Sequence, residues 1–211
     1  MSHGLVPAPG ATVVRRRHDV GASRRTGWVM VLTGTVGWLA SFQLTVDDWR
    51  ILRDPAYQPP CDISPVVSCG SVMSSPQGSL LGFPNMLLGL GAFAAVVALG
   101  TAVLSGARLH RRLWLALDAG ALTAVTFVHW LIVQSLYELD KLCPYCAVVW
   151  VVTIALFWFL TLHCLERGVL PAPRGVLMIL RETHWMLLGA WYGVIALLAL
   201  TRFWPYWVGL L

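Results

Sequence analysis

Five cysteines are the residues of this chain whose type and spacing could support chemistry: Cys61, Cys69, Cys143, Cys146 and Cys164. Two of them form the motif CPYC at the start of a long apolar run. Residues three apart share one face of a helix, so the sulfurs of Cys143 and Cys146 can meet, and a proline is tolerated in the first turn. The positive end of the helix dipole favours the thiolate, which is the attacking species in disulfide exchange. The motif therefore predicts a redox-active pair, with a static disulfide or half of a zinc site as the alternatives.

The other pair, Cys61 and Cys69, lies in the string CDISPVVSC, with seven residues between the two cysteines. A bond between them would close a small surface loop, and such loops commonly hold plain structural disulfides. Four thiolates together could also bind zinc. The resting pairing is open at this point, because four cysteines allow three pairings.

The elements that must position these cysteines are strongly apolar. The chain of 211 residues is 57% hydrophobic and 12% charged, against roughly 45–50% and 25% for a soluble domain. This composition excludes a soluble globular protein and a disordered one. Continuous apolar runs near the ~20 residues that cross a bilayer, without strict alternation, indicate helices. We therefore expect an all-α integral membrane protein with transmembrane helices at residues 28–46, 85–104, 113–136, 143–165 and 183–203.

The arginines and one lysine set the expected orientation. Eleven of the 15 basic residues fall in segments 1–27, 105–112 and 166–182, and the rest fall in 47–84, 137–142 and near the C-terminus. The positive-inside rule makes the first set cytoplasmic, including the basic tail 1–27. The long loop 47–84 and the C-terminus are then extracytoplasmic. Nucleic acid is not an expected partner, because the basic residues lie between apolar runs rather than on one folded face.

This orientation places four cysteines, Cys61, Cys69, Cys143 and Cys146, on the oxidising face of the membrane. Two disulfide-capable pairs on one face could pass electrons by thiol–disulfide exchange from a soluble donor to an acceptor in the bilayer. Cys164 lies at the other end of the fourth span, where a buried cysteine behaves as a small hydrophobic residue. We expect it to be dispensable.

The string CDISPVVSCGSVMSSPQGSLLGFPN, followed by CPYC at the start of a later helix, resembles the vitamin K epoxide reductase family in its bacterial branch. The resemblance rests jointly on C-D-x6-C, the pair Ser74 and Ser75, the FPN at 83–85, and C-P-x-C. It covers residues 28–165 and implies a four-helix transmembrane core. Residues 166–211 would then add an inner loop and a fifth transmembrane helix.

The resemblance also implies a role for each cysteine. In that family the helix pair reduces a membrane quinone, and the loop pair relays electrons from a thioredoxin-fold partner. Carried over by position, Cys146 is the quinone-facing thiolate and Cys143 its partner. Cys69 exchanges with Cys143, and Cys61 is attacked first by the partner protein. The implied activity is that of a thiol:quinone oxidoreductase in disulfide bond formation, with vitamin K epoxide reduction as a side activity.

A quinone pocket follows from the same resemblance. Asn85 matches an asparagine that hydrogen-bonds a quinone carbonyl, and Trp150 lies one helical turn after Cys146, where the family has an aromatic residue. Met73, Phe83 and Phe127 are further candidates to line the pocket, and no metal is expected. A composition rich in Arg, Trp and Ala and poor in Lys is typical of high-GC actinobacteria, so menaquinone is expected rather than ubiquinone.

The expected partner is a separate protein. Many bacterial relatives continue after a fifth helix into a fused thioredoxin-like domain, whereas this chain ends at Leu211. We therefore expect a stand-alone form in the plasma membrane that serves an extracytoplasmic, DsbA-like thioredoxin-fold protein.

Three other classes of protein fit the sequence less well. Disulfide bond formation protein B performs the same reaction but has its C-x-x-C on the first outer loop, whereas here the C-x-x-C comes last. A transporter or channel would have polar residues in several mid-spans or internal repeats, and neither is evident. A structural membrane subunit would keep two inert disulfides under mild reductant.

Several polar and small residues have structural interpretations. His129, within the third span, is expected to hydrogen-bond a neighbouring helix as a neutral side chain, although intramembrane ionisable groups are functional candidates. Asp118 is expected to pair with Arg111 or Arg112. Gly189 and Gly193 form a G-x-x-x-G that could be a close contact within the fold or a dimer seam. Solvated surface charges are expected for Asp62, Glu138 and Asp140.

Overall fold

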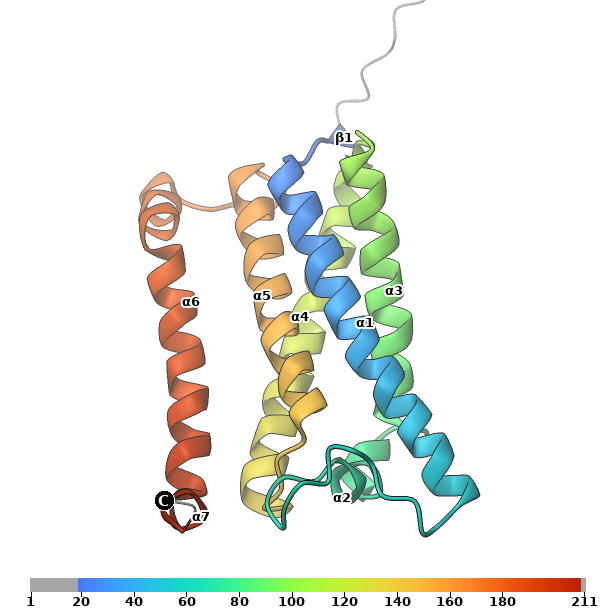
Figure 1. Cartoon of the computed structure of the whole chain (residues 1–211). Coiled ribbons are helices and arrows are strands. Elements are labelled where there is room, and N and C mark those ends of the chain that lie inside the picture. The colour runs from blue at the N-terminus through green and yellow to red at the C-terminus, as the bar shows by residue number, and fades with distance from the viewer. Residues whose placement is uncertain (1–18, 210–211) are drawn as a thin grey trace, which may run out of the picture.

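The computed structural model describes residues 19–209, so most of the expected tail at 1–27 lies outside the described residues. The described chain is mainly helical (Figure 1). Its elements in chain order are β1 (Asp19–Val20), α1 (Arg24–Arg53), α2 (Cys69–Met73), η1 (Pro76–Ser79), α3 (Asn85–Leu104), β2 (Leu109–His110), α4 (Arg111–Val133), η2 (Gln134–Glu138), α5 (Pro144–Glu166), α6 (Arg174–Arg202) and α7 (Trp204–Val208).

Five of the helices are long and apolar enough to cross a membrane: α1, α3, α4 with its continuation η2, α5 and α6. This finding confirms the expected all-α membrane protein with five spans. The first turn of a helix leaves backbone N–H groups without helical partners, and side chains at the start of three spans supply acceptors, including His110, which accepts from the N–H of Arg112 at the start of α4. Ser23 accepts from the N–H of Thr26 at the start of α1, and Cys143 accepts from the N–H of Cys146 at the start of α5.

The first span is longer than the sequence predicts. We expected it to end at Val46 because Asp47 and Asp48 follow, but α1 continues to Arg53. Asp47 is fully buried, and its carboxylate accepts hydrogen bonds from Gln43 and Tyr57. A buried carboxylate with such partners can remain inside a helix, so the loop between α1 and α2 begins at residue 54 rather than 47.

The fifth span also begins earlier, at Arg174 instead of Thr183. The first turns of α6 carry charged side chains, so a search for continuous apolar residues does not include them in the span. Arg181 forms an ion pair with Glu166 at the end of α5, with 3.0 Å between nitrogen and oxygen. The charges therefore lie at the end of the bundle and do not interrupt the helix.

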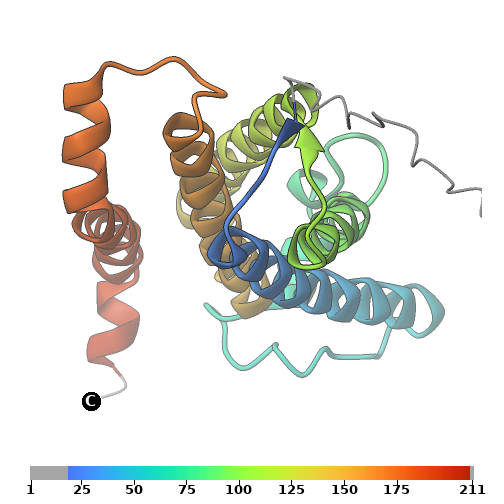
Figure 2. The same ribbon diagram turned by 90° about the horizontal axis from the view of Figure 1, so that it is seen from above.

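The first four spans form a bundle in which α1 packs against α3 and α5, and α5 packs against α4 (Figure 2). Glycines on α1 permit the close approach to α3, as is common between membrane helices. A Cβ on Gly37 would lie 2.5 Å from the Phe93 ring, and one on Gly34 would lie 2.8 Å from Val97. At the end of the bundle opposite the cysteines, β1 pairs with β2, and the Trp114 indole donates to the carbonyl of Val20.

The fifth spanning helix, α6, stands beside the bundle (Figure 1) and makes specific polar contacts with it. Trp191 donates to His129 Nε2 over 2.9 Å, and the Tyr192 hydroxyl donates to the carbonyl of Val151. His129 thus hydrogen-bonds a neighbouring helix, as expected. At the cysteine end, Arg202 donates to the carbonyl of Leu136 and forms an ion pair with Asp140.

The G-x-x-x-G of α6 makes no close contact within the chain. A Cβ on Gly189 or Gly193 would meet no atom within 4 Å in the described part of the chain. Of the two alternatives for this motif, the described residues do not show the close contact within the fold, because the aromatic and arginine side chains of α6, rather than its glycines, reach the bundle.

The expected pairing of Asp118 with an arginine is also wrong. Asp118 accepts a 2.7 Å hydrogen bond from Thr161 on α5, while Arg111 donates to the carbonyl of Val169. Asp118 lies on the face of α4 that packs against α5, where the Thr161 hydroxyl donates to it. Cys164 is fully buried nearby in the apolar cluster around Trp114, as expected of a small hydrophobic residue.

The glycine contact between α1 and α3 gives a stability prediction. Gly37→Ala should lower the free energy of unfolding by about 1–3 kcal/mol, because the added methyl group must displace the buried Phe93 ring. Thermal unfolding in detergent, followed by tryptophan fluorescence, measures the change.

Gly189→Ala is the matched control, since it makes the same substitution inside a spanning helix where there is open space. We expect no loss of stability from it. Equal destabilisation by the two variants would contradict the close α1–α3 contact.

Candidate active site

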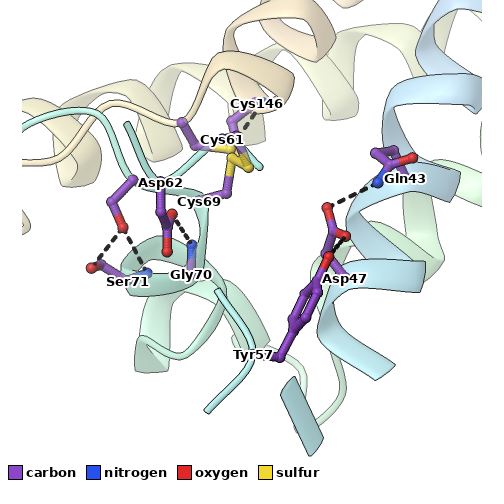
Figure 3. Close-up of a disulfide and its surroundings, with 11 residues drawn as sticks. Gln43, Asp47, Tyr57, Cys61, Asp62, Cys69, Gly70, Ser71 and Cys146 are labelled. Carbon is purple, nitrogen blue, oxygen red and sulfur yellow. Dashed lines mark hydrogen bonds between the residues drawn. A yellow bond between two sulfur atoms is a disulfide. The ribbon is translucent and has the colours of Figure 1, made fainter. Parts of the chain in front are cut away.

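Four cysteines from two segments distant in the sequence meet at one end of the bundle, and Figure 3 shows three of them, Cys61, Cys69 and Cys146. Cys61, Cys69 and Cys143 are buried in one apolar cluster with Leu44, and Cys146 packs against that cluster. Cys61 and Cys69 form a disulfide, whereas Cys143 and Cys146 are free thiols. The structure therefore brings together both pairs that the sequence singles out.

The disulfide loop is ordered by local capping. Cys69 opens the short helix α2, and the preceding Ser68 accepts from the N–H of Ser71. Asp62, next to Cys61, accepts from the N–H of Gly70 over 3.0 Å. A Cβ on Gly70 would lie 2.7 Å from the Asp62 carboxylate, so this close approach requires glycine. Asp62 thus has a structural partner and is not simply a solvated charge.

The loop is joined to the connection between α4 and α5 by a short parallel pairing. Val67 pairs with Leu142, the N–H of Ser68 donates to the carbonyl of Leu142, and the N–H of Leu142 donates to the carbonyl of Val66. The Lys141 ammonium also donates to the carbonyl of Pro65. Because the pairing is parallel, the chain runs in the same direction from Val67 to Cys69 and from Leu142 to Cys143. The two cysteines are therefore brought into the same cluster.

The start of α5 favours a thiolate at Cys143, which is 1% exposed. The pKa of the Cys143 thiol is lowered from its ordinary value, first because the Cys146 thiol donates a hydrogen bond to it. The backbone N–H groups of Cys146 and Tyr145 lower this pKa further, while burial and the charge of Asp62 raise it. The Cys143 sulfur lies at the positive end of the α5 dipole, which also favours the thiolate form.

The disulfide bears on the alternative of a zinc site. With Cys61 and Cys69 bonded, only two of the four sulfurs could ligate a metal. Within residues 19–209, no three His, Cys, Asp or Glu side chains are grouped as a metal site requires.

Two of the expected quinone residues lie beside Cys146. Met73 is buried in the cysteine cluster, and Trp150 is buried in a neighbouring cluster with Ile132 and Leu136. Cys146 packs against both clusters, so an apolar, partly aromatic wall meets a free, half-buried thiol. Such a wall suits the flat, apolar ring of a quinone.

The other three candidates lie elsewhere or have other partners. Both ends of the Asn85 side-chain amide contact the preceding turn: it donates to the carbonyl of Gln77 over 2.6 Å and accepts from the N–H of Leu80. Phe83 is 40% exposed, and Phe127 stacks on Trp130 with 5.8 Å between ring centroids. In the described chain, neither phenylalanine belongs to the two clusters that contact Cys146.

A polar network at the C-terminal end of α1 was not predicted from the sequence (Figure 3). The Asp47 carboxylate accepts from Gln43 over 3.0 Å and from the Tyr57 hydroxyl over 2.9 Å, and Arg50 donates to that hydroxyl. Asp47 lies one turn beyond Leu44, which packs on the cysteines. The network thus holds the start of the outer loop against α1. The four-residue spacing of Gln43 and Asp47 was the available signal, since such residues share a helix face.

The altered pKa of Cys143 predicts the pH dependence of its alkylation. In the fully reduced chain, the midpoint of reaction with iodoacetamide should fall below that of an ordinary cysteine. Cys146→Ala removes the largest stabilising hydrogen bond, so the midpoint should rise and alkylation at neutral pH should slow. Peptide mass spectrometry measures the modified fraction of Cys143.

Cys146→Ser is the matched control, because its hydroxyl can still donate to the Cys143 sulfur. We expect its midpoint to lie between those of the wild type and Cys146→Ala. If Ala and Ser variants titrate alike, the thiol of Cys146 does not stabilise the thiolate.

The contact of Lys141 with the disulfide loop predicts a selective kinetic effect. Lys141→Met should slow electron transfer from the loop pair to the helix pair by about two- to tenfold, because a charge-assisted hydrogen bond holding the loop is lost. Rapid-quench trapping of thiols after reduction of the loop pair measures this step.

Lys141→Arg keeps a donor at the same place and should restore most of the rate. Oxidation of the pre-reduced helix pair alone should be unchanged in both variants. A slowing of that later step by Lys141→Met would show that the lysine affects more than the position of the loop.

The segment that holds the two cysteine pairs matches a known protein family. The model described as the vitamin K epoxide reductase family matches residues 28–161. The match includes both cysteine pairs, α3, α4 and most of α1 and α5. No match to the chain is found among curated proteins. The chain belongs to the vitamin K epoxide reductase family, and it is a membrane oxidoreductase of that family.

Proposed function

We propose that the protein oxidises the dithiol of an extracytoplasmic, DsbA-like thioredoxin-fold protein and passes two electrons to a membrane quinone. One observation supports this proposal above the others: the parallel pairing of Val67 with Leu142 joins the two segments that lead into Cys69 and Cys143. All four cysteines contact one buried cluster, so thiol–disulfide exchange between the pairs needs no large movement.

The cycle begins with the partner. A partner thiolate attacks Cys61, the Cys61–Cys69 bond breaks, and Cys69 leaves as a thiolate. The second partner thiol then resolves the mixed disulfide, so the partner leaves oxidised and the loop pair is reduced. Two electrons and two protons have entered the loop pair.

The second exchange moves these electrons to the helix pair. With Cys143 and Cys146 in a disulfide, the Cys69 thiolate attacks Cys143 and releases Cys146 as a thiolate. Cys61 then attacks Cys69, re-forms the loop disulfide and releases Cys143. The products are a bonded loop pair and a free helix pair, which are the pairings present in this structure.

The last step oxidises the helix pair. Cys143 and Cys146 together give two electrons and two protons to the quinone, which leaves as quinol, and the disulfide between them forms. Met73 and Trp150 supply an apolar surface beside Cys146 for the ring. Asn85 would have to release Gln77 or Leu80 to contact a quinone carbonyl. Menaquinone is the proposed acceptor, and vitamin K epoxide is at most a side substrate.

The orientation of the chain in the plasma membrane is part of the proposal. The cysteine end is taken as extracytoplasmic, where a thioredoxin-fold protein is oxidised, and the described end carrying Arg25, Arg112, Arg167 and Arg174 is taken as cytoplasmic. The distribution of basic residues supports this orientation.

The decisive test is anaerobic quinol formation by the purified chain, with a reduced thioredoxin-fold dithiol as donor and menaquinone as acceptor. Cys146→Ala should abolish quinol formation, because no second thiol can then close the helix disulfide. The absorbance change of the quinone measures the rate.

Cys164→Ala provides the matched control, since Cys164 is the one cysteine outside the cluster and is buried near the opposite end of α5. Its rate should stay within about twofold of the wild type, because an exchange reaction depends on the attacking thiols. Quinol formation that persists in Cys146→Ala, or is absent from the wild type, would favour a structural subunit with inert disulfides.

A further inference from the structure

A cavity of about 220 Å³ lies at the end of the bundle opposite the cysteines, between α1, α5 and α6. It is several times larger than the ~30 Å³ that one water occupies in the liquid, so it has room for a larger polar group. Three helices contribute to its lining: Ser23, Arg25, Thr26 and Val29 from α1, Phe159, Leu162, His163 and Glu166 from α5, and Arg181 and His184 from α6.

The cavity carries a positive charge that the described chain does not neutralise. Its charged side chains are Arg25, Arg181 and Glu166, and Glu166 is already paired with Arg181. Arg25 contacts no carboxylate in residues 19–209; its guanidinium lies against two rings, 5.7 Å from the centroid of Phe159 and 5.6 Å from that of Trp185. Rings hold an arginine in place and leave its N–H donors available to an anion.

Two histidine nitrogens at the cavity also lack partners. His163 is 4% exposed, and its Nε2 is buried without a hydrogen bond. His184 Nε2 is likewise buried and unpaired, while its Nδ1 lies 2.6 Å from the carbonyl of Arg181 and must donate there. Buried polar atoms without partners are rare in native proteins and often mark the place of an unseen group.

An exposed apolar stripe leads away from the cavity along α1. Trp28 and Leu32 follow Arg25 at three and seven residues, so all three lie on one face of the helix. These two side chains are 50% and 59% exposed. An arginine at the end of an apolar stripe fits a headgroup above an acyl chain, and basic pockets between membrane helices are known lipid-headgroup sites.

We propose that this cavity binds a phosphate anion, carried by the headgroup of an anionic phospholipid in the leaflet on that side. Arg25 and His163 bind the phosphate oxygens, and the acyl chain lies along Trp28 and Leu32. Because the cavity includes Arg181 of α6, the lipid adds a contact that α6 shares with α1 and α5.

The test uses the full chain, stripped of lipid in neutral detergent and titrated by native mass spectrometry. The probes are dioleoylphosphatidylglycerol, dioleoylphosphatidylcholine and inorganic phosphate. We expect one tight phosphatidylglycerol site, with affinity at least about fivefold above that for phosphatidylcholine, because both lipids carry the phosphate but the quaternary ammonium of phosphatidylcholine offsets its charge and is repelled by Arg25. Arg25→Gln should remove this preference, and Arg25→Lys should restore much of it.

Arg167→Gln is the matched control, since Arg167 is an exposed arginine at the same end of α5 that does not line the cavity. It should leave the preference intact. His163→Phe keeps the ring against Trp114 and removes the unpaired nitrogen, so it should weaken phosphatidylglycerol binding even if Arg25→Gln fails to fold.

Equal losses in Arg25→Gln and Arg167→Gln, or equal affinity for the two lipids in the wild type, would overturn the proposal. Full displacement of phosphatidylglycerol by an equal concentration of inorganic phosphate would retain the anion site but overturn the lipid as its source. None of these outcomes depends on quinone reduction.

Discussion

Two backbone hydrogen bonds, between Ser68 and Leu142 and between Leu142 and Val66, set the register on which the redox site depends. Each is worth only about 1 kcal/mol, yet they align the segments that lead into Cys69 and Cys143. A slip of one residue would move one sulfur by ~3.3 Å along its strand and turn it to the other face. The proposed exchange between the pairs would therefore depend on a pairing held by only two backbone hydrogen bonds.

The spanning helices could be predicted from the sequence because a bilayer imposes a local requirement, a run of apolar residues of sufficient length. Their ends could not, because each end depends on partners distant in the chain. Asp47 stays within α1 since Tyr57, in the outer loop, donates to it. Arg181 stays within α6 since Glu166 belongs to the previous span. A charged residue therefore predicts the end of a spanning helix only when the fold offers it no hydrogen-bond or ion-pair partner.

The candidate site shows the same difference between features set by neighbouring residues and features set by residues distant in the chain. Cys143 capping its own helix is a local property of CPYC, and the sequence predicts it. The contact of Lys141 with the carbonyl of Pro65 joins residues far apart in the chain, and no motif indicates it. The proposed pocket residues divide similarly: Met73 and Trp150 lie beside Cys146 because of their helix register, whereas the amide of Asn85 is engaged by the turn before it.

The length of α1 makes the position of the cysteine cluster depend on the thickness of the membrane. Thirty helical residues span about 45 Å at 1.5 Å per residue, whereas the hydrocarbon core is only ~30 Å thick. The helix must tilt or emerge, and Figure 1 shows it running obliquely to α3. Leu44 and Asp47 move with its outer end, so a thicker bilayer, by making α1 more upright, would change the depth of the cysteine cluster relative to the layer in which quinones diffuse.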